Sequence, residues 1–416
     1  MVEGFAEYDS KRSWLVCLGA MFVFGVSMGI SNCFGVLFNS WTHEFRESRT
    51  KIAWVGSFHF IWYMLLSPVC GILTRRYSFR LVTFSGSIVL CLGLLVASFV
   101  NDVAMFYLTY SLIFASGTCL LFASAIIVIG FCFKKHFALA SGLVLAANGG
   151  FVMWCGPVYE YLIRNHGWRS TLRIFVLLLI PLVMACLLFP GKREITGNRD
   201  AGQVNEPAVA PARLLRNKGF MTWLLIMFLV YIGLFIPQVH LISFCEDLGI
   251  PSFVSVYNIT IMCATETACK IIGGKMIDAL SWNVHTFNVF SILALAVSIT
   301  LLPLASAKIH VFLFSGFYGC GLGIQSVCVI NITPQLTHPN DAKHAVTYLF
   351  GALSIPGGLG PVFAAWIFDV TRSYDMAFFI AGGLFALAAC LAVFIQSIAL
   401  ENTRVAQILL QDEEQP

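Results

Sequence analysis

FVSVYNITIMCATETACKIIGGKMID, residues 253–278, is a long apolar run that carries one acid and one base in its middle. As a single helix, its roughly 26 residues at about 1.5 Å each span nearly 40 Å, which places Glu266 roughly 20 Å from either end. Lys270 follows one turn later on the same face, in the favourable order for an ion pair. Two interpretations stay open: a structural pair that locks two helices together, or a site for a charged substrate and a proton.

The rest of the chain is as apolar as this run. Of its 416 residues, 58% are hydrophobic and only 11% are charged, with a mean hydropathy of +0.84, whereas a soluble domain has about 25% charged residues. Apolar stretches of about 20 residues recur from end to end, which indicates membrane-spanning helices rather than barrel strands. A charge at the centre of a bilayer costs at least about 2.5 to 3.5 kcal/mol, so it persists mainly beside a partner or a water-filled cavity. Twelve spans are predicted, at 14–38, 52–74, 81–100, 103–130, 137–161, 171–190, 220–244, 253–278, 284–305, 309–332, 344–368 and 374–399.

One polar interval, residues 191–219, divides these spans into six and six. We therefore expect an N-terminal six-helix bundle at 1–190, a cytoplasmic linker at 191–219, a C-terminal six-helix bundle at 220–399 and a cytoplasmic tail at 400–416. The turn after the second span, GILTRRYSFR, is echoed after the eighth by GGKMIDALSW, which indicates a duplicated unit. Paired bundles of this kind place a substrate site between them near the membrane midplane.

The basic residues predict the orientation. Sixteen of the 25 Lys and Arg residues fall on one side of the predicted spans and eight on the other, with Lys270 inside a span. The more basic side is the cytoplasmic one, so both termini are expected there. On that side, Asp278 and the group Arg75, Arg76 and Arg80 are candidates for ionic latches between helices, with solvated loop charge as the alternative. The loop cations account for the net charge of +4, and no nucleic-acid partner is expected.

Other kinds of chemistry find no support in the sequence. Most of the fourteen cysteines lie inside apolar runs without metal-ligand spacing, which is typical of packing residues. No nucleophile, metal or phosphate motif has a suitable spacing. We therefore predict a protein that is not an enzyme and that needs neither a cofactor nor a metal.

Several motifs together resemble the monocarboxylate transporter family of the major facilitator superfamily. In DSKRSWLV, Asp9 and Trp14 keep the two ends of the family's entry motif, and CFKKHFALASGLVLAANGG, residues 132–150, is similar to its fifth-helix signature. Further matches are Trp54, Pro68, Tyr77, Arg80, Gly360, Pro361, Asp369 and Tyr374. The resemblance covers essentially the whole chain. It implies an all-α membrane protein with twelve transmembrane helices in two pseudo-symmetric bundles, the major facilitator fold.

The resemblance also implies roles for individual residues. Glu266 and Lys270 stand where proton-coupled members carry an Asp and an Arg, of which the Arg pairs with the substrate carboxylate and the Asp takes part in proton handling. Asn32 stands where lactate carriers have a proton-carrying lysine, so proton symport and facilitated diffusion both stay open. His59, in the second span, is a candidate for the missing proton carrier, with a packing histidine as the alternative. Asn148 and Ser354 are polar groups in apolar spans, which either contact substrate or bridge helices.

The expected function is therefore alternating-access transport of a small monocarboxylate or related organic anion. The hypothesis includes proton coupling through Glu266 and Lys270. The alternatives are an amino-acid or organic-solute uniporter and a non-transporting sensor that retains the fold. The expected partners are the small carboxylate or amino-acid substrate, protons, the lipid bilayer and, as for some relatives, an ancillary single-span glycoprotein. A multi-pass protein of the plasma membrane is expected.

Overall fold

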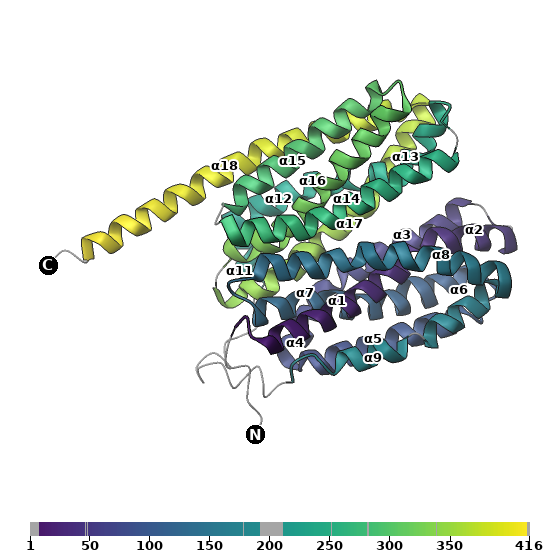
Figure 1. Ribbon diagram of the computed structural model, residues 1–416, viewed down its shortest axis with the longest axis horizontal. Helices are drawn as coiled ribbons and strands as arrows, with labels where there is room; N and C mark the ends of the chain where they lie inside the picture. Colours follow the sequence, from purple (N-terminus) through teal and green to yellow (C-terminus); the bar gives the residue numbers. More distant parts are fainter. Residues whose placement is uncertain are drawn as a thin grey trace.

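The computed structural model of the protein describes residues 8–413, except 46, 48, 178, 192–210, 251, 281, 282 and 338. Its described residues contain helices and no strand. Most of the predicted linker lies outside them, and the linker's end forms the short helix α11. The helices form two bundles that lie side by side, the first purple to blue and the second green to yellow (Figure 1).

The first bundle runs from α1 to α9. Its helices are α1 (Lys11–Asn32), α2 (Phe34–Phe45), α3 (Arg49–Leu65), α4 (Ser67–Arg76), α5 (Phe79–Ala97), α6 (Val103–Leu108), the π-helical segment η1 (Thr109–Phe114), α7 (Ala115–Cys132), α8 (Phe137–Leu177) and α9 (Leu179–Cys186).

The second bundle runs from α11 to α18. Its helices are α11 (Pro211–Arg216), α12 (Lys218–Leu234), α13 (Ile236–Asp247), α14 (Ser252–Leu280), α15 (Val284–Leu301), the 3₁₀ turn η2 (Leu302–Leu304), α16 (Lys308–Gln335), α17 (Pro339–Thr371) and α18 (Asp375–Glu413). The start of α1 and the far end of α18 lie at the same end of the molecule (Figure 1). An even number of crossings has this consequence.

The observed helices account for the twelve predicted spans. Ten helical stretches of the described chain are long and apolar enough to cross a membrane. One of them, Phe137–Cys186, contains two predicted spans, and α8 changes direction within it at Gly167, whose φ of 75° is a conformation that glycine adopts without strain. Helix α14 is outside that set of ten. It carries Glu266 and Lys270 and is the twelfth span.

Local sequence explains where several helices start and break. The Ser10 side chain accepts a hydrogen bond from the Ser13 N–H and caps α1, and Ser78 caps α5 in the same way. Pro68 stands in the first turn of α4, where its missing N–H costs nothing, and it separates α4 from α3. Pro237 similarly follows the break between α12 and α13.

The two bundles meet mainly where α14 packs on α8 and where α17 packs on α3 and α4, and glycines allow the close approach. A side chain on Gly142 of α8 would overlap the carbonyl oxygen of Lys270 on α14. A side chain on Gly351 of α17 would come within 2.7 Å of Pro68 on α4. Small residues let membrane helices pack backbone against backbone, so these contacts define a tight seam between the bundles.

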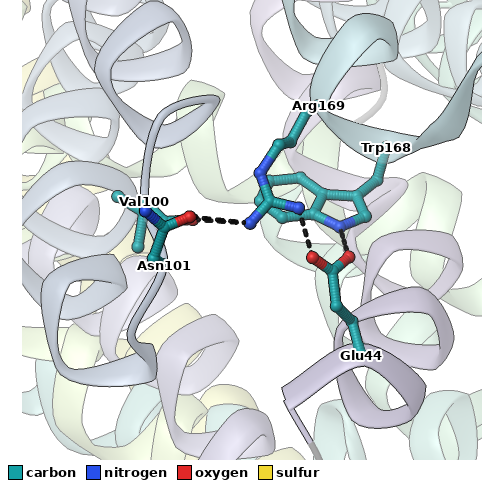
Figure 2. Close-up of polar contacts among 5 residues, drawn as sticks. All are labelled: Glu44, Val100, Asn101, Trp168 and Arg169. Carbon is teal, nitrogen blue, oxygen red and sulfur yellow. Dashed lines mark hydrogen bonds and ion pairs between the residues drawn. The ribbon is translucent and has the colours of Figure 1, made fainter.

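A polar cluster (Figure 2) ties together the end of the first bundle where α2 lies, which is away from the chain termini (Figure 1). Glu44 of α2 accepts hydrogen bonds from the Trp168 indole and the Arg169 guanidinium of α8. Arg169 also donates to the Val100 carbonyl and to the Asn101 side chain, each at 3.1 Å. Its guanidinium lies 4.3 Å from the centre of the Trp168 ring. This cluster joins three segments of one bundle and does not reach the other.

Candidate substrate site between the two bundles

A cavity of about 460 Å³ lies between the two bundles, on the seam that α8 and α14 form. The first bundle contributes residues of α1, α3, α7 and α8, and the second contributes residues of α12, α13, α14, α16 and α17. A cavity of this size is large enough for a small organic molecule. Its position between paired bundles is where such proteins hold their substrate.

Glu266 and Lys270 both line this cavity. The Lys270 ammonium lies 2.6 Å from a Glu266 carboxylate oxygen, and the two side chains are 6% and 18% exposed. The lysine is therefore buried in an ion pair that faces the cavity and is not sealed inside a dry helix contact. Charged side chains that are paired within a membrane-spanning bundle and that face a cavity are typical of substrate and ion pathways.

Asn32 and Asn148 form a second polar pair in the cavity wall. The side-chain NH₂ group of Asn32 donates a hydrogen bond to the side-chain oxygen of Asn148 at 3.0 Å, and this bond joins α1 to α8 within the first bundle. Each side chain keeps further hydrogen-bonding capacity, since an amide group has two donors and an acceptor with two lone pairs. The cavity thus has an ion pair contributed by the second bundle and an amide pair contributed by the first.

The remaining wall is mostly aromatic and apolar, and its residues were not predicted from the sequence. Seven aromatic side chains line it: Phe24, Phe60, Tyr63, Phe122, Tyr231, Phe235 and Phe350. Gln238, Thr267 and Ser326 add polar groups. Gln238 follows Pro237 directly, and this helix-breaking proline is the sequence signal that could have found it. Thr267 lies on the helix face that the spacing of Glu266 and Lys270 already marks.

Two of the residues predicted to bind substrate or to carry a proton lie outside the cavity lining. His59 is buried among aromatic rings, with its centre 5.1 Å from that of Tyr110 and 5.0 Å from that of Phe114. Its Nδ1 is 3.3 Å from the Tyr110 carbonyl oxygen. Ser354 is fully buried in α17 and donates to the Gly351 carbonyl one turn earlier. The structure places both side chains in helix packing.

Asp278 joins the two bundles at the end where the chain termini lie. Its carboxylate accepts hydrogen bonds from the backbone N–H groups of Ala138 and Leu139, at 3.1 and 2.7 Å. These groups belong to the first turn of α8, where N–H groups lack helical partners and the helix dipole favours an anion. Asp278 of one bundle therefore caps a helix of the other.

Asp9 binds the neighbouring N–H groups of the same region from within the first bundle. Its carboxylate accepts from the backbone of Lys134, Lys135 and His136, at 3.0 to 3.3 Å. Partial burial opposes ionisation of Asp9, but these three donors outweigh it and hold the pKa below its usual range. The contact fastens the start of α1 to the start of α8.

The three predicted latch arginines have different surroundings. The Arg80 side chain donates to the Phe189 carbonyl oxygen at 3.0 Å, which ties α5 to the segment that follows α9 inside the first bundle. Arg75 and Arg76 lie in the last turn of α4, and the Arg76 guanidinium is 5.8 Å from the centre of the Tyr77 ring. Asp278, the acidic member of the predicted latch group, makes two hydrogen bonds across the seam.

Comparison with known proteins identifies the fold. A sequence model described as Major Facilitator Superfamily matches residues 17–361. The solved structure of the transporter FucP in the outward conformation superposes with a TM-score of 0.73 at 16% identity, covering 92% of this chain and 98% of that chain. The proton:xylose symporter XylE superposes with a TM-score of 0.74 at 13% identity, covering 92% and 95%. These structures share the fold with the present chain.

Curated sequences with similarity over nearly the whole chain include monocarboxylate transporters. Monocarboxylate transporter 10 of Danio rerio is 27% identical over 393 residues, covering 91% of this chain and 77% of the relative. Monocarboxylate transporter 13 of Rattus norvegicus is 25% identical over 407 residues, covering 97% and 94%. Monocarboxylate transporter 10 of Mus musculus is 29% identical over 394 residues, covering 89% and 75%. The chain thus belongs to the major facilitator superfamily, and it is an integral, multi-pass membrane protein related to monocarboxylate transporters.

Proposed function

We propose that this protein is a secondary carrier for a small organic monocarboxylate, whose carboxylate group pairs with Lys270 during transport. The observation that carries the proposal is the Glu266–Lys270 pair in the wall of the interbundle cavity. The names of the relatives support the same substrate class. The amide pair of Asn32 and Asn148 supplies hydrogen bonds that orient the bound molecule.

The charges in the cavity set a condition on the substrate. The empty site is neutral, because Glu266 balances Lys270. A bound monocarboxylate that takes Lys270 from Glu266 leaves one negative charge without a partner, and an uncompensated buried charge is costly. Protonation of Glu266 removes this cost, which makes the substrate and a proton move together. We therefore infer proton symport for a simple monocarboxylate.

An amino acid is the second candidate, and the same pair favours it. Its carboxylate would meet Lys270 while its ammonium group meets Glu266, so the loaded site stays neutral without a proton. The two candidates differ in a measurable way, since the monocarboxylate requires a proton and the zwitterion does not. In both cases the aromatic walls accommodate an apolar body next to the charged groups.

The contacts of the seam support alternating access. Asp278 and the close approach of Gly142 to α14 hold the bundles together at the end where the chain termini lie. Release of these contacts would let the cavity open toward that end while the opposite ends close. We infer that this end faces the cytoplasm, as the basic residues predict, and that the protein acts in the plasma membrane. An ancillary single-span glycoprotein is a further expected partner, testable by co-expression and surface labelling.

Uptake by purified protein in proteoliposomes tests the proposal. Labelled monocarboxylates and amino acids are supplied with and without an inward proton gradient, and counterflow distinguishes a carrier from a binding-only sensor. Lys270→Gln is expected to abolish uptake of the transported compound, while Lys275→Gln, an exposed position on the same helix, retains it. Uptake by Lys270→Gln at the wild-type rate, with equal protein in the vesicles, would falsify the proposed role of the lysine.

A further inference from the structure

Two cysteines on neighbouring helices form a thiol pair that the substrate site does not use. Cys269 of α14 faces α16, because a side chain on Gly323 of α16 would come within 2.8 Å of the Cys269 Cβ, and Cys320 lies about one turn before Gly323 on α16. All fourteen cysteines of the chain are free thiols, and both members of this pair are partly exposed. Two adjacent thiols can each form a bond to the same atom of a ligand, whereas a lone cysteine can form one bond.

The backbone holds these two helices unusually close at this point. A side chain on Gly323 of α16 would overlap the Glu266 carbonyl oxygen and come within 2.8 Å of the Cys269 Cβ. Gly319, one turn earlier, faces the Met262 carbonyl in the same manner. Since small residues four apart permit direct backbone packing, the separation of the two thiols is set by rigid helices and not by flexible loops.

The thiol pair faces away from the substrate cavity. Neither cysteine lines that cavity, whereas Cys263, on the same helix as Cys269, does. Ile272, one turn after Cys269, is 54% exposed, and Phe317, one turn before Cys320, is 65% exposed. Large apolar side chains exposed on a membrane-spanning helix face lipid. A ligand for the pair therefore arrives through the bilayer and must be lipid-soluble and thiol-seeking.

We propose that Cys269 and Cys320 form a covalent site for lipid-soluble trivalent arsenicals of the R–As=O class. Both thiol sulfurs bond to arsenic, the As–O bonds break, and the two thiol protons leave with the oxygen as one water molecule. Arsenic stays trivalent, so no oxidant or reductant is needed. Sulfur is the soft ligand that such a centre prefers. The product bridges α14 and α16 beside the helix turn that carries Lys270.

Other cysteines provide matched controls. Cys155 lies beside α1 near Cys33, since a side chain on Gly29, one turn before Cys33, would be 3.5 Å from the Cys155 sulfur, but both cysteines are buried in the first bundle. Cys263 is partly exposed, as Cys269 is, but it faces the cavity. Serine at each of these positions removes one thiol at nearly unchanged size, so loss of the adduct can be assigned to the pair.

Phenylarsine oxide and intact-protein mass spectrometry test the proposal on the full-length protein in lipid nanodiscs. One adduct per chain is expected that survives excess monothiol and is removed by 2,3-dimercaptopropanol. It should be lost in Cys269→Ser and in Cys320→Ser, and kept in Cys263→Ser and Cys155→Ser. Peptide mapping should show both cysteines in one bridged product, and size-exclusion profiles check that each variant is folded. An adduct that persists in either variant of the pair, or that monothiol strips from the wild type, overturns the proposal.

Discussion

Substitution of Asp278 by Asn is expected to weaken the closed seam at the end where the termini lie. Asn keeps the size of the side chain and one acceptor oxygen, but it loses the charge and the second acceptor. The two hydrogen bonds of Asp278 to the α8 backbone measure 2.7 and 3.1 Å. A hydrogen bond to a charged group contributes about 1.5 to 3 kcal/mol and a neutral one about 1 kcal/mol.

The expected cost follows from these values. Loss of one bond and weakening of the other, discounted because Asp278 is only half-buried, gives about 1 to 2 kcal/mol. Since about 1.4 kcal/mol is tenfold in an equilibrium, the population open at this end should rise by roughly five- to thirtyfold while it is the minor state. This change acts on the equilibrium between conformations and leaves the cavity residues in place.

Cys263 reports the opening, because it lies in the cavity wall. A membrane-impermeant maleimide is applied to proteoliposomes from the side of the termini, and peptide mass spectrometry follows the labelling rate of Cys263. Asp278→Asn should accelerate labelling by about the factor given above. Asp9→Asn is the matched control, because Asp9 binds the same helix end from within one bundle and should not change access. The reasoning is refuted if Asp278→Asn labels at the wild-type rate, or if Asp9→Asn accelerates labelling equally.

Three further predictions concern two packing sites and one ion pair. Thermal unfolding in detergent measures the stability change in each, and uptake by proteoliposomes is also measured for the third. Gly274→Ala should cost about 1 to 3 kcal/mol of stability, because the added methyl group would overlap the α8 backbone. Gly273→Ala should be nearly neutral, because the nearest atom to its added methyl group is 3.6 Å away. Equal effects of the two substitutions would contradict the close packing of α14 on α8. Tyr318→Phe should cost about 1 kcal/mol, because the Tyr318 hydroxyl donates to the Leu234 carbonyl oxygen at 2.9 Å. Tyr110→Phe should be neutral or stabilising, because the Tyr110 hydroxyl is buried without a hydrogen-bond partner among the described residues. A larger loss of stability in Tyr110→Phe than in Tyr318→Phe would contradict this prediction. Glu44→Gln should cost less than about 1 kcal/mol and keep uptake, because the Glu44 and Arg169 side chains are 38% and 32% exposed; loss of uptake would give this end of the bundle a role in transport.

Some features of the site follow from local sequence alone. The four-residue spacing of Glu266 and Lys270 sets their common helix face in any fold that keeps the helix, so the pair was predictable. The twelve spans were also predictable, because an apolar stretch of about 20 residues matches the thickness of the bilayer's hydrocarbon core when it is helical. The break at Gly167 lies between two predicted spans, and the structure adds the backbone conformation of this glycine.

Other features depend on contacts between distant parts of the chain. Asn32 and Asn148 lie 116 residues apart and are joined by the packing of α1 on α8. The seven aromatic side chains of the cavity look in sequence like any others in apolar spans, because hydropathy does not show whether a residue faces lipid, a core or a cavity. For the same reason, a polar residue in a span could not be assigned from sequence, and His59 and Ser354 lie in helix packing.

The sequence by itself determined that this chain crosses a membrane many times and carries an acid and a base at the centre of one crossing. These properties depend on composition and on helical spacing, which act over a few turns. The tertiary structure decided that the pair lies on a cavity between two bundles and that Asp278 caps a helix of the other bundle across the seam. The physical reason is that helical spacing fixes which residues share a face, whereas the packing of one helix against another decides what that face meets.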